Sequence, residues 1–146
     1  MSKYDILKEY EQNLMYIEYL IGSGITNNLQ LNKLGHELFG DSYIGTLSSD
    51  MFPKYISNEQ CFIMNNKSSR SSGEHFVAFY KRNNKLYGYD SFDREPKTLS
   101  RYWKHKHIIN ANKDRLQSFR EYNCGSKSMA WLMSFKKWGE RVIDAL

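Results

Sequence analysis

The sequence predicts a single α+β domain, and three observations carry this prediction. The chain has 146 residues, a length that fits one domain with one hydrophobic core. Hydrophobic residues make up 40% of it and aromatic residues 15%, as in a packed globular protein rather than a tail or linker. Helical patterns come first, strand patterns follow and a helical pattern ends the chain. That order is typical of α+β proteins and differs from the alternation of a doubly wound sheet.

Two amphipathic helices are expected before residue 41. Apolar side chains at steps of three, four or seven predict a helix over residues 4–21, and the glycines after it end it. Residues 1–24 would then form an amino-terminal helical extension of the domain, packed against its core. Polar side chains at 26–28 supply capping oxygens for a second helix, which ends at Gly40. The expected apolar positions are Tyr4, Leu7, Leu14, Ile17 and Ile21 in the first helix, and Leu29, Leu31, Leu34 and Leu38 in the second.

The middle of the chain is typical of strands. Residues 41–57 are expected to be an ordered loop. Aromatic-rich runs at 75–80 and 86–90 predict a hairpin whose turn contains Asn83 and Asn84. The remaining predictions are strands at 61–64, 107–110 and 115–118, a short helix at 98–103 and a long helix at 125–145. Met129, Leu132, Met133 and Phe135 of the last helix are expected to face the core.

Charge and cysteine content limit the classes of function. The net charge of +5 and a pI near 9.1 favour attraction to nucleic acid or another acidic surface, but carry no chemical information. No apolar run approaches the roughly 20 residues that cross a bilayer, so we expect a soluble, intracellular protein with no membrane partner. Neither Cys61 nor Cys124 lies in a C-x-x-C pair, which argues against a zinc site and a disulfide framework. No metal site is expected.

Cys124 is the first candidate for chemistry. It lies in Asn123-Cys124-Gly125, immediately before the last predicted helix. A thiolate in that position is stabilised by the positive end of the helix dipole and by backbone N–H groups. Gly125 would also let a substrate carbonyl approach the backbone closely. A small buried cysteine at a helix start is the alternative, and this motif alone favours it.

Two further side chains have the chemistry that a cysteine nucleophile needs. His75 opens an aromatic strand directly after Gly73 and Glu74. There an imidazole can accept the thiol proton and later protonate a leaving amine. Gln117 precedes Cys124 across a short loop, where its amide can stabilise an oxyanion together with a backbone N–H. A structural or solvated histidine and a surface glutamine are the ordinary alternatives.

Asp90 completes the set. It closes the strand next to that of His75, so its carboxylate is expected beside the imidazole, where it would fix the tautomer and stabilise the imidazolium. Asp93 is the rival, but we expect it to point into the following loop. The order His75, Asp90, Gln117, Cys124 is more informative than any one of the four residues.

These motifs resemble the adenovirus endopeptidase (adenain) family and, more distantly, the proteases of ubiquitin-like proteins. The most specific element is the spacing from Gln117 to Cys124-Gly125. The resemblance covers roughly residues 29–138, through the runs 39–53, 73–79 and 87–92 and the Gln117 to Gly125 segment.

The resemblance implies a fold, an activity and roles for residues. The fold would be papain-like, with the cysteine helix packed on a mostly antiparallel sheet. Cys124 would be the nucleophile of a thiol protease, His75 its base, Asp90 the third triad member and Gln117 the oxyanion donor. The viral members cleave capsid and core precursors during virion maturation, which implies an enzyme in the infected cell and in the virion. Substrate contacts are expected from Gly73, Glu74, Phe76 and Gly125.

The resemblance also implies partners, with one departure. No cofactor is required, although a short peptide and DNA activate adenain. This chain has no cysteine between Asp90 and Cys124 to hold a peptide by a disulfide. A basic patch at Arg101, Lys104 and Lys106 would suit DNA, and an ordinary solvated edge explains it equally well.

Two other functions stay open at this stage. The first is an isopeptidase acting on a ubiquitin-like modifier, since Tyr89-Asp90-Ser91 and Cys124-Gly125 also suit that branch. A short chain argues against it, because modifier recognition needs a broad docking surface. The second is a non-enzymatic module that binds nucleic acid or capsid protein on the same scaffold. A monomer is expected in each case.

Overall fold

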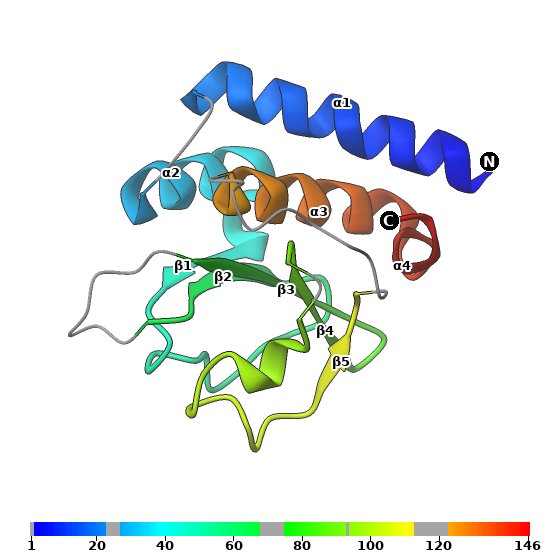
Figure 1. Cartoon of the computed structure of the whole chain (residues 1–146). Helices are drawn as coiled ribbons and strands as arrows, with labels where there is room; N and C mark the ends of the chain where they lie inside the picture. The colour runs from blue at the N-terminus through cyan, green and yellow to red at the C-terminus, as the bar shows by residue number, and fades with distance from the viewer. Residues whose placement is uncertain (1, 23–26, 68–74, 93, 113–122) are drawn as a thin grey trace.

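A computed structural model describes residues 2–22, 27–67, 75–92, 94–112 and 123–146. These residues form an α+β fold with four α-helices and one five-stranded sheet (Figure 1). The predicted fold class is therefore confirmed at this level. The sheet is mixed rather than mostly antiparallel, since its central pairs of strands are antiparallel and its outer pairs parallel.

The two amino-terminal helices begin at side-chain caps. Helix α1 (Lys3–Ile21) has a capping box between Ser2 and Asp5, and α2 (Asn28–Phe39) has one between Asn27 and Gln30. Such reciprocal bonds satisfy N–H groups that the first turn leaves open. Both helices thus lie within a few residues of their predicted bounds.

The stripe of α1 that packs against the core agrees with the predicted one in part, at Leu7, Leu14, Ile17 and Ile21. Ile6, Tyr10 and Ile17 are buried, whereas Tyr4 is 73% exposed. On α2, Leu29 is 82% exposed. Steps of three, four and seven can be drawn through overlapping sets of apolar residues, so periodicity alone could not choose between neighbouring faces. The predictions for Tyr4 and Leu29 were wrong for this reason.

The sheet has the strand order β1-β2-β3-β4-β5. Strand β1 was missed, because it falls in the segment predicted as a loop, where five residues around a glycine give only a weak strand pattern. The predicted hairpin is confirmed, and Asn83 and Asn84 both adopt positive φ, as a type I′ turn requires. The strands are β1 (Tyr43–Leu47), β2 (Cys61–Asn65), β3 (Phe76–Arg82), β4 (Lys85–Asp90) and β5 (Ile108–Asn110).

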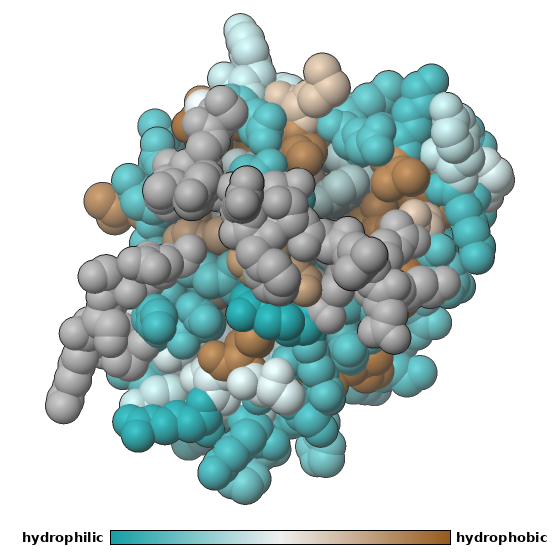
Figure 2. All heavy atoms as spheres, in the orientation of Figure 1, coloured by the Kyte–Doolittle hydropathy of each residue, from teal (hydrophilic) through white to brown (hydrophobic). Residues whose placement is uncertain are grey.

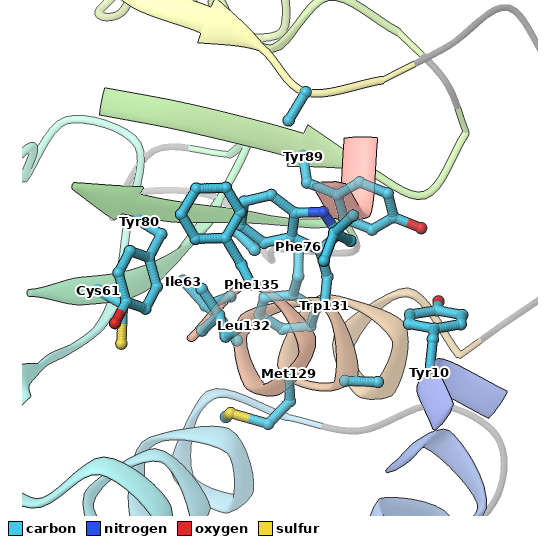
Figure 3. Packing of buried hydrophobic residues seen from close by; sticks show 14 of the residues in the cluster. Tyr10, Cys61, Ile63, Phe76, Tyr80, Tyr89, Met129, Trp131, Leu132 and Phe135 are labelled. Carbon is cyan, nitrogen blue, oxygen red and sulfur yellow. The ribbon is translucent and has the colours of Figure 1, made fainter. Parts of the chain in front are cut away.

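Helix α3 (Cys124–Trp138) packs between α1 and the sheet (Figure 1). Figure 3 shows Trp131 and Phe135 reaching from α3 toward the strands. The Trp131 ring stacks on Tyr89, and Phe135 contacts the rings of Tyr80 and Tyr87. This aromatic layer fixes where the first turn of α3 meets the ends of β3 and β4.

The single helix predicted for residues 125–145 is two helices. Gly139 adopts φ 60°, a left-handed conformation that ends α3, and α4 (Arg141–Ala145) follows. The predicted helix at 98–103 is only the 3₁₀ turn η2 (Pro96–Thr98), and a second such turn, η1 (Gly40–Ser42), precedes β1. The strand predicted at 115–118 lies outside the described residues.

The other face of the sheet has its own small core. The Trp103 ring is fully buried there and donates its Nε1–H to the Ser49 carbonyl at 2.9 Å. Phe62, Phe79 and Phe52 surround it. The chain around η2, at the bottom of the view in Figure 2, presents a strongly hydrophilic surface. Among the described helices, none is long and apolar enough to cross a membrane.

Candidate active site

The candidate active site lies where the start of β3, the end of β4 and the start of α3 meet. In the β3–β4 pair Val77 lies opposite Asp90, so His75, two residues before Val77, lies level with the carboxyl end of β4. Both side chains are buried, and His75 Nε2 contacts Asp90 Oδ1 directly. The sheet register, set by the hairpin turn, therefore brings together two residues that the sequence predicted as neighbours.

Cys124 reaches the same imidazole from the first residue of α3. Its side chain hydrogen-bonds the His75 side chain. Because Nε2 faces Asp90, Nδ1 is the ring nitrogen left for the sulfur. The two cysteines differ in this respect, since Cys61, the first residue of β2, is buried among core residues.

The Asp90 carboxylate is surrounded by donors. Its Oδ1 accepts the Phe92 N–H at 3.3 Å besides contacting His75. Its Oδ2 accepts the backbone N–H of Arg94 at 3.1 Å and the Arg94 Nε–H at 2.7 Å. A buried carboxylate with this many donors is held as an anion and in one orientation.

Two further contacts fix the loop that follows β4. The Asn112 side chain accepts the Asp90 N–H at 3.1 Å and donates to the Arg94 carbonyl at 2.5 Å. The Phe92 ring stacks on the His75 ring, with centroids 4.7 Å apart and planes 18° from parallel. The imidazole is thus held at its edge by Asp90 and on its face by Phe92.

The electrostatics favour a charged pair. Burial opposes the protonated form of His75, but hydrogen bonds and charge interactions with Asp90 and Cys124 outweigh it and raise its pKa. Burial likewise opposes ionised Asp90, yet the hydrogen bonds from His75 and Arg94 outweigh it and lower the pKa of the carboxyl. A raised imidazole pKa beside a carboxylate and a cysteine sulfur favours the protonated histidine that a thiolate–imidazolium nucleophile contains.

The other predicted site residues are placed as follows. Gly73, Glu74 and Gln117, and the rival acid Asp93, lie outside the described residues. Phe76 is buried in the core, and its carbonyl accepts the Ser128 hydroxyl at 3.2 Å. Because the Phe76 ring packs in the core, this placement does not favour a substrate contact through the ring. Gly125 is buried in the first turn of α3.

The predicted basic patch flanks Trp103, whose ring is buried in the smaller core on the other face of the sheet from α3. Arg101, Lys104 and Lys106 are exposed on the segment between η2 and β5. The Arg101 guanidinium bonds the Tyr102 hydroxyl at 2.9 Å. The Lys106 ammonium lies 5.0 Å from the centroid of the Phe52 ring. Arg101 and Lys106, two of the three cations, therefore lie against neighbouring aromatic rings, as solvated residues at a surface edge often do.

Sequence reasoning missed the residues that hold the triad. The sequence offers one indication of the Arg94 contact, its position four residues after Asp90. In a loop, however, no periodicity predicts which side chains meet. Phe92 and Asn112 had no such indication. Within the described residues, no group of three or more His, Cys, Asp or Glu side chains could hold a metal ion.

The sequence matches no protein-family model and no curated protein.

Proposed function

We propose that this chain is a cysteine endopeptidase with Cys124 as nucleophile, His75 as general base and acid, and Asp90 as the residue that orients the imidazole. One observation carries the proposal: the buried His75 ring contacts a carboxylate through one nitrogen and hydrogen-bonds a helix-start cysteine as well. Cysteine hydrolases use this chain of groups, a nucleophile, a base and an orienting acid.

The chemistry follows from the protonation states. With the proton of Cys124 on His75, the thiolate attacks a peptide carbonyl and forms a carbon–sulfur bond. The oxyanion that develops lies next to the N-terminal backbone amides of α3, and Gln117 is the proposed side-chain donor. His75 Nδ1–H then protonates the departing amine. A water molecule, deprotonated by His75, hydrolyses the thioester and restores the thiol.

The scaffold supports the proposed relationship to adenain-like and papain-like proteases. The nucleophile begins a central helix that packs on a sheet, and the base and the acid come from the ends of adjacent antiparallel strands. On that relationship, the substrates are viral capsid or core precursor proteins, cleaved near glycine during virion maturation in the infected cell and the virion. DNA or a peptide is the proposed activator.

A panel of glycine-containing peptides and candidate structural precursors, digested and read by mass spectrometry, tests the proposal. Cleavage that is lost in Cys124→Ala and after thiol alkylation would support it. Release of a ubiquitin-like modifier without cleavage of the peptides would make the chain an isopeptidase. Retention on DNA with no cleavage of either substrate would make it a binding module. Both of these last results would overturn the endopeptidase assignment.

A further inference from the structure

The residue before the nucleophile has a polar contact with a distant helix. Asn123 donates its Nδ2–H to Glu18 Oε1 of α1 at 3.0 Å. Glu18 is half-buried, and the Asn123 Oδ1 atom is buried with no hydrogen-bond partner among the described residues. An amide oriented by a carboxylate on one side and left unsatisfied on the other indicates that the Glu18 bond determines where this side chain lies.

Asn123 is the N-cap residue of α3 but does not cap it. Asparagine is among the best N-cap residues, because its side-chain oxygen accepts N–H groups of the first turn. Here the side chain forms no capping bond. At the caps of α1 and α2, Ser2 and Asn27 do form such bonds. The Asn123 side chain, bonded to Glu18, thus leaves the first turn of α3 without a side-chain cap.

Helix α1 also contacts the other half of the site. The Tyr10 hydroxyl hydrogen-bonds Tyr89, which directly precedes Asp90 on β4. Figure 3 shows the hydroxyl ends of Tyr10 and Tyr89 turned toward one another beside Trp131. One helix thus contacts the chain neighbours of two proposed catalytic residues, Asp90 and Cys124.

We infer that α1 is a positioning element of the active site, in which Glu18 holds Asn123 off the first turn of α3 so that its amides stay open to a thiolate or an oxyanion. This inference rests on the proposed function. Glu18 is a positioning residue, since it acts through Asn123, and Tyr10 supports the β4 end of the same site.

The test compares Glu18→Ala and Glu18→Gln with a matched control on the same helix pair. Glu9 of α1 bonds Lys137 Nζ at 2.5 Å and Trp138 Nε1 at 2.9 Å, at the far end of α3. Glu9→Ala removes an interaction between the same two helices without touching Asn123. Glu18→Gln keeps an acceptor for Asn123 and removes only the charge.

Three measurements are made on each full-length variant: kcat and KM on a cleaved peptide, the rate of iodoacetamide alkylation at Cys124, and amide hydrogen exchange in the first turn of α3. For Glu18→Ala we expect kcat and alkylation to fall about 10- to 100-fold, with KM little changed. Exchange in that turn should slow as Asn123 becomes a cap. Glu18→Gln and Glu9→Ala should stay within about threefold of the unmodified chain.

Two results would overturn the inference: unchanged kcat, alkylation and exchange in Glu18→Ala, or an equal loss in Glu9→Ala, which would reduce α1 to a structural support. Tyr10→Phe, which keeps the ring, should lower kcat less than Glu18→Ala, and a larger loss of kcat than in Glu18→Ala would also contradict the inference.

If the unmodified chain neither cleaves peptide nor alkylates at Cys124 faster than free cysteine, the proposed function fails instead. The exchange comparison still tests the contact.

Discussion

The chain has two cysteines in very different surroundings. Cys61 is fully buried at the first residue of β2, and burial raises the pKa of its thiol to about 12. Cys124 is 7% exposed at the first residue of α3 and hydrogen-bonds a histidine that is itself held by a carboxylate. Both residues count as buried, so burial does not separate them. The difference lies in the titratable groups that each sulfur faces.

Both cysteines are the first residue of their element, so the surroundings of each sulfur explain this difference. A residue in a central strand is enclosed by neighbouring strands and by the helices packed on the sheet, as Cys61 is. A residue at the start of a helix meets the ends of the neighbouring strands, where His75 and Asp90 lie. On the proposed function, the Cys124 thiol is the reactive one and the Cys61 thiol is inert.

The largest expected effect separates the two cysteines directly. Cys124→Ala should abolish peptide cleavage, a loss on the order of 10⁴-fold or more, because no other group in the proposed mechanism attacks the carbonyl. Cys61→Ala should keep kcat within about twofold and lower the free energy of unfolding by about 1 kcal/mol, through a small cavity. Steady-state kinetics and urea unfolding measure both. Cleavage that survives Cys124→Ala and is lost in Cys61→Ala would reverse the assignment.

Asp90→Asn should have the next largest effect. It removes the carboxylate that orients His75 and should lower kcat by about 10²- to 10⁴-fold.

Asp90→Asn should also change how the free energy of unfolding depends on pH. Because the folded pKa of His75 is raised, the pair stabilises the fold below the ordinary value of 6.5, and this contribution is lost as pH rises through the folded pKa.

Because the pKa of Asp90 is lowered, its ionised form stabilises the fold above the ordinary carboxyl pKa of 3.8, and this contribution is lost as pH falls through the folded value. The difference in unfolding free energy between the unmodified chain and Asp90→Asn should therefore be largest near pH 5 to 6 and shrink toward pH 9. Denaturant unfolding across that range measures it. A difference that grows with pH would contradict the assigned pair.

Arg94→Gln should have a smaller effect that appears mainly in the pH profile. The groups facing the Asp90 carboxylate are His75 and Arg94, and those facing the imidazole are Asp90 and Cys124. Without the guanidinium, the carboxylate keeps its backbone N–H donors and the imidazolium but loses a cation, so the pKa of His75 and that of Asp90 should both rise. Both limbs of the profile of kcat/KM should move to higher pH, with kcat reduced several-fold. Arg94→Lys, which keeps the charge, should restore most of the profile, and limbs that stay in place would remove the proposed role of Arg94.

The sequence predicted the parts of the site that lie on regular elements. His75 and Asp90 were found because a hairpin has a register, and the ends of adjacent strands must meet. Cys124 was found because a helix start has a definite chemistry. The fold class and the bounds of most elements followed from periodicity. Strand β1 and the break at Gly139 did not, because short or interrupted patterns are weak.

The supporting contacts could not be predicted. Asp90 bonds Arg94 and Asn112 through irregular loops, whose backbone path is set by tertiary packing rather than by local pattern. Glu18 and Asn123 are 105 positions apart in the chain. Their contact exists only because α1 and α3 pack against each other, and the apolar stripe predicted for α1, although largely confirmed, does not say which helix it packs against.

One measurement tests the central claim most directly. The folded protein is treated with iodoacetamide from pH 5 to pH 9, and the modified peptides are quantified by mass spectrometry, so that Cys124 and Cys61 are compared within the same molecule. We predict that Cys124 reacts at least about 100-fold faster than Cys61 near neutral pH, and that His75→Ala removes most of this advantage. Equal rates at the two thiols, or a Cys124 rate that His75→Ala leaves unchanged, would contradict an imidazole-activated sulfur at the start of α3.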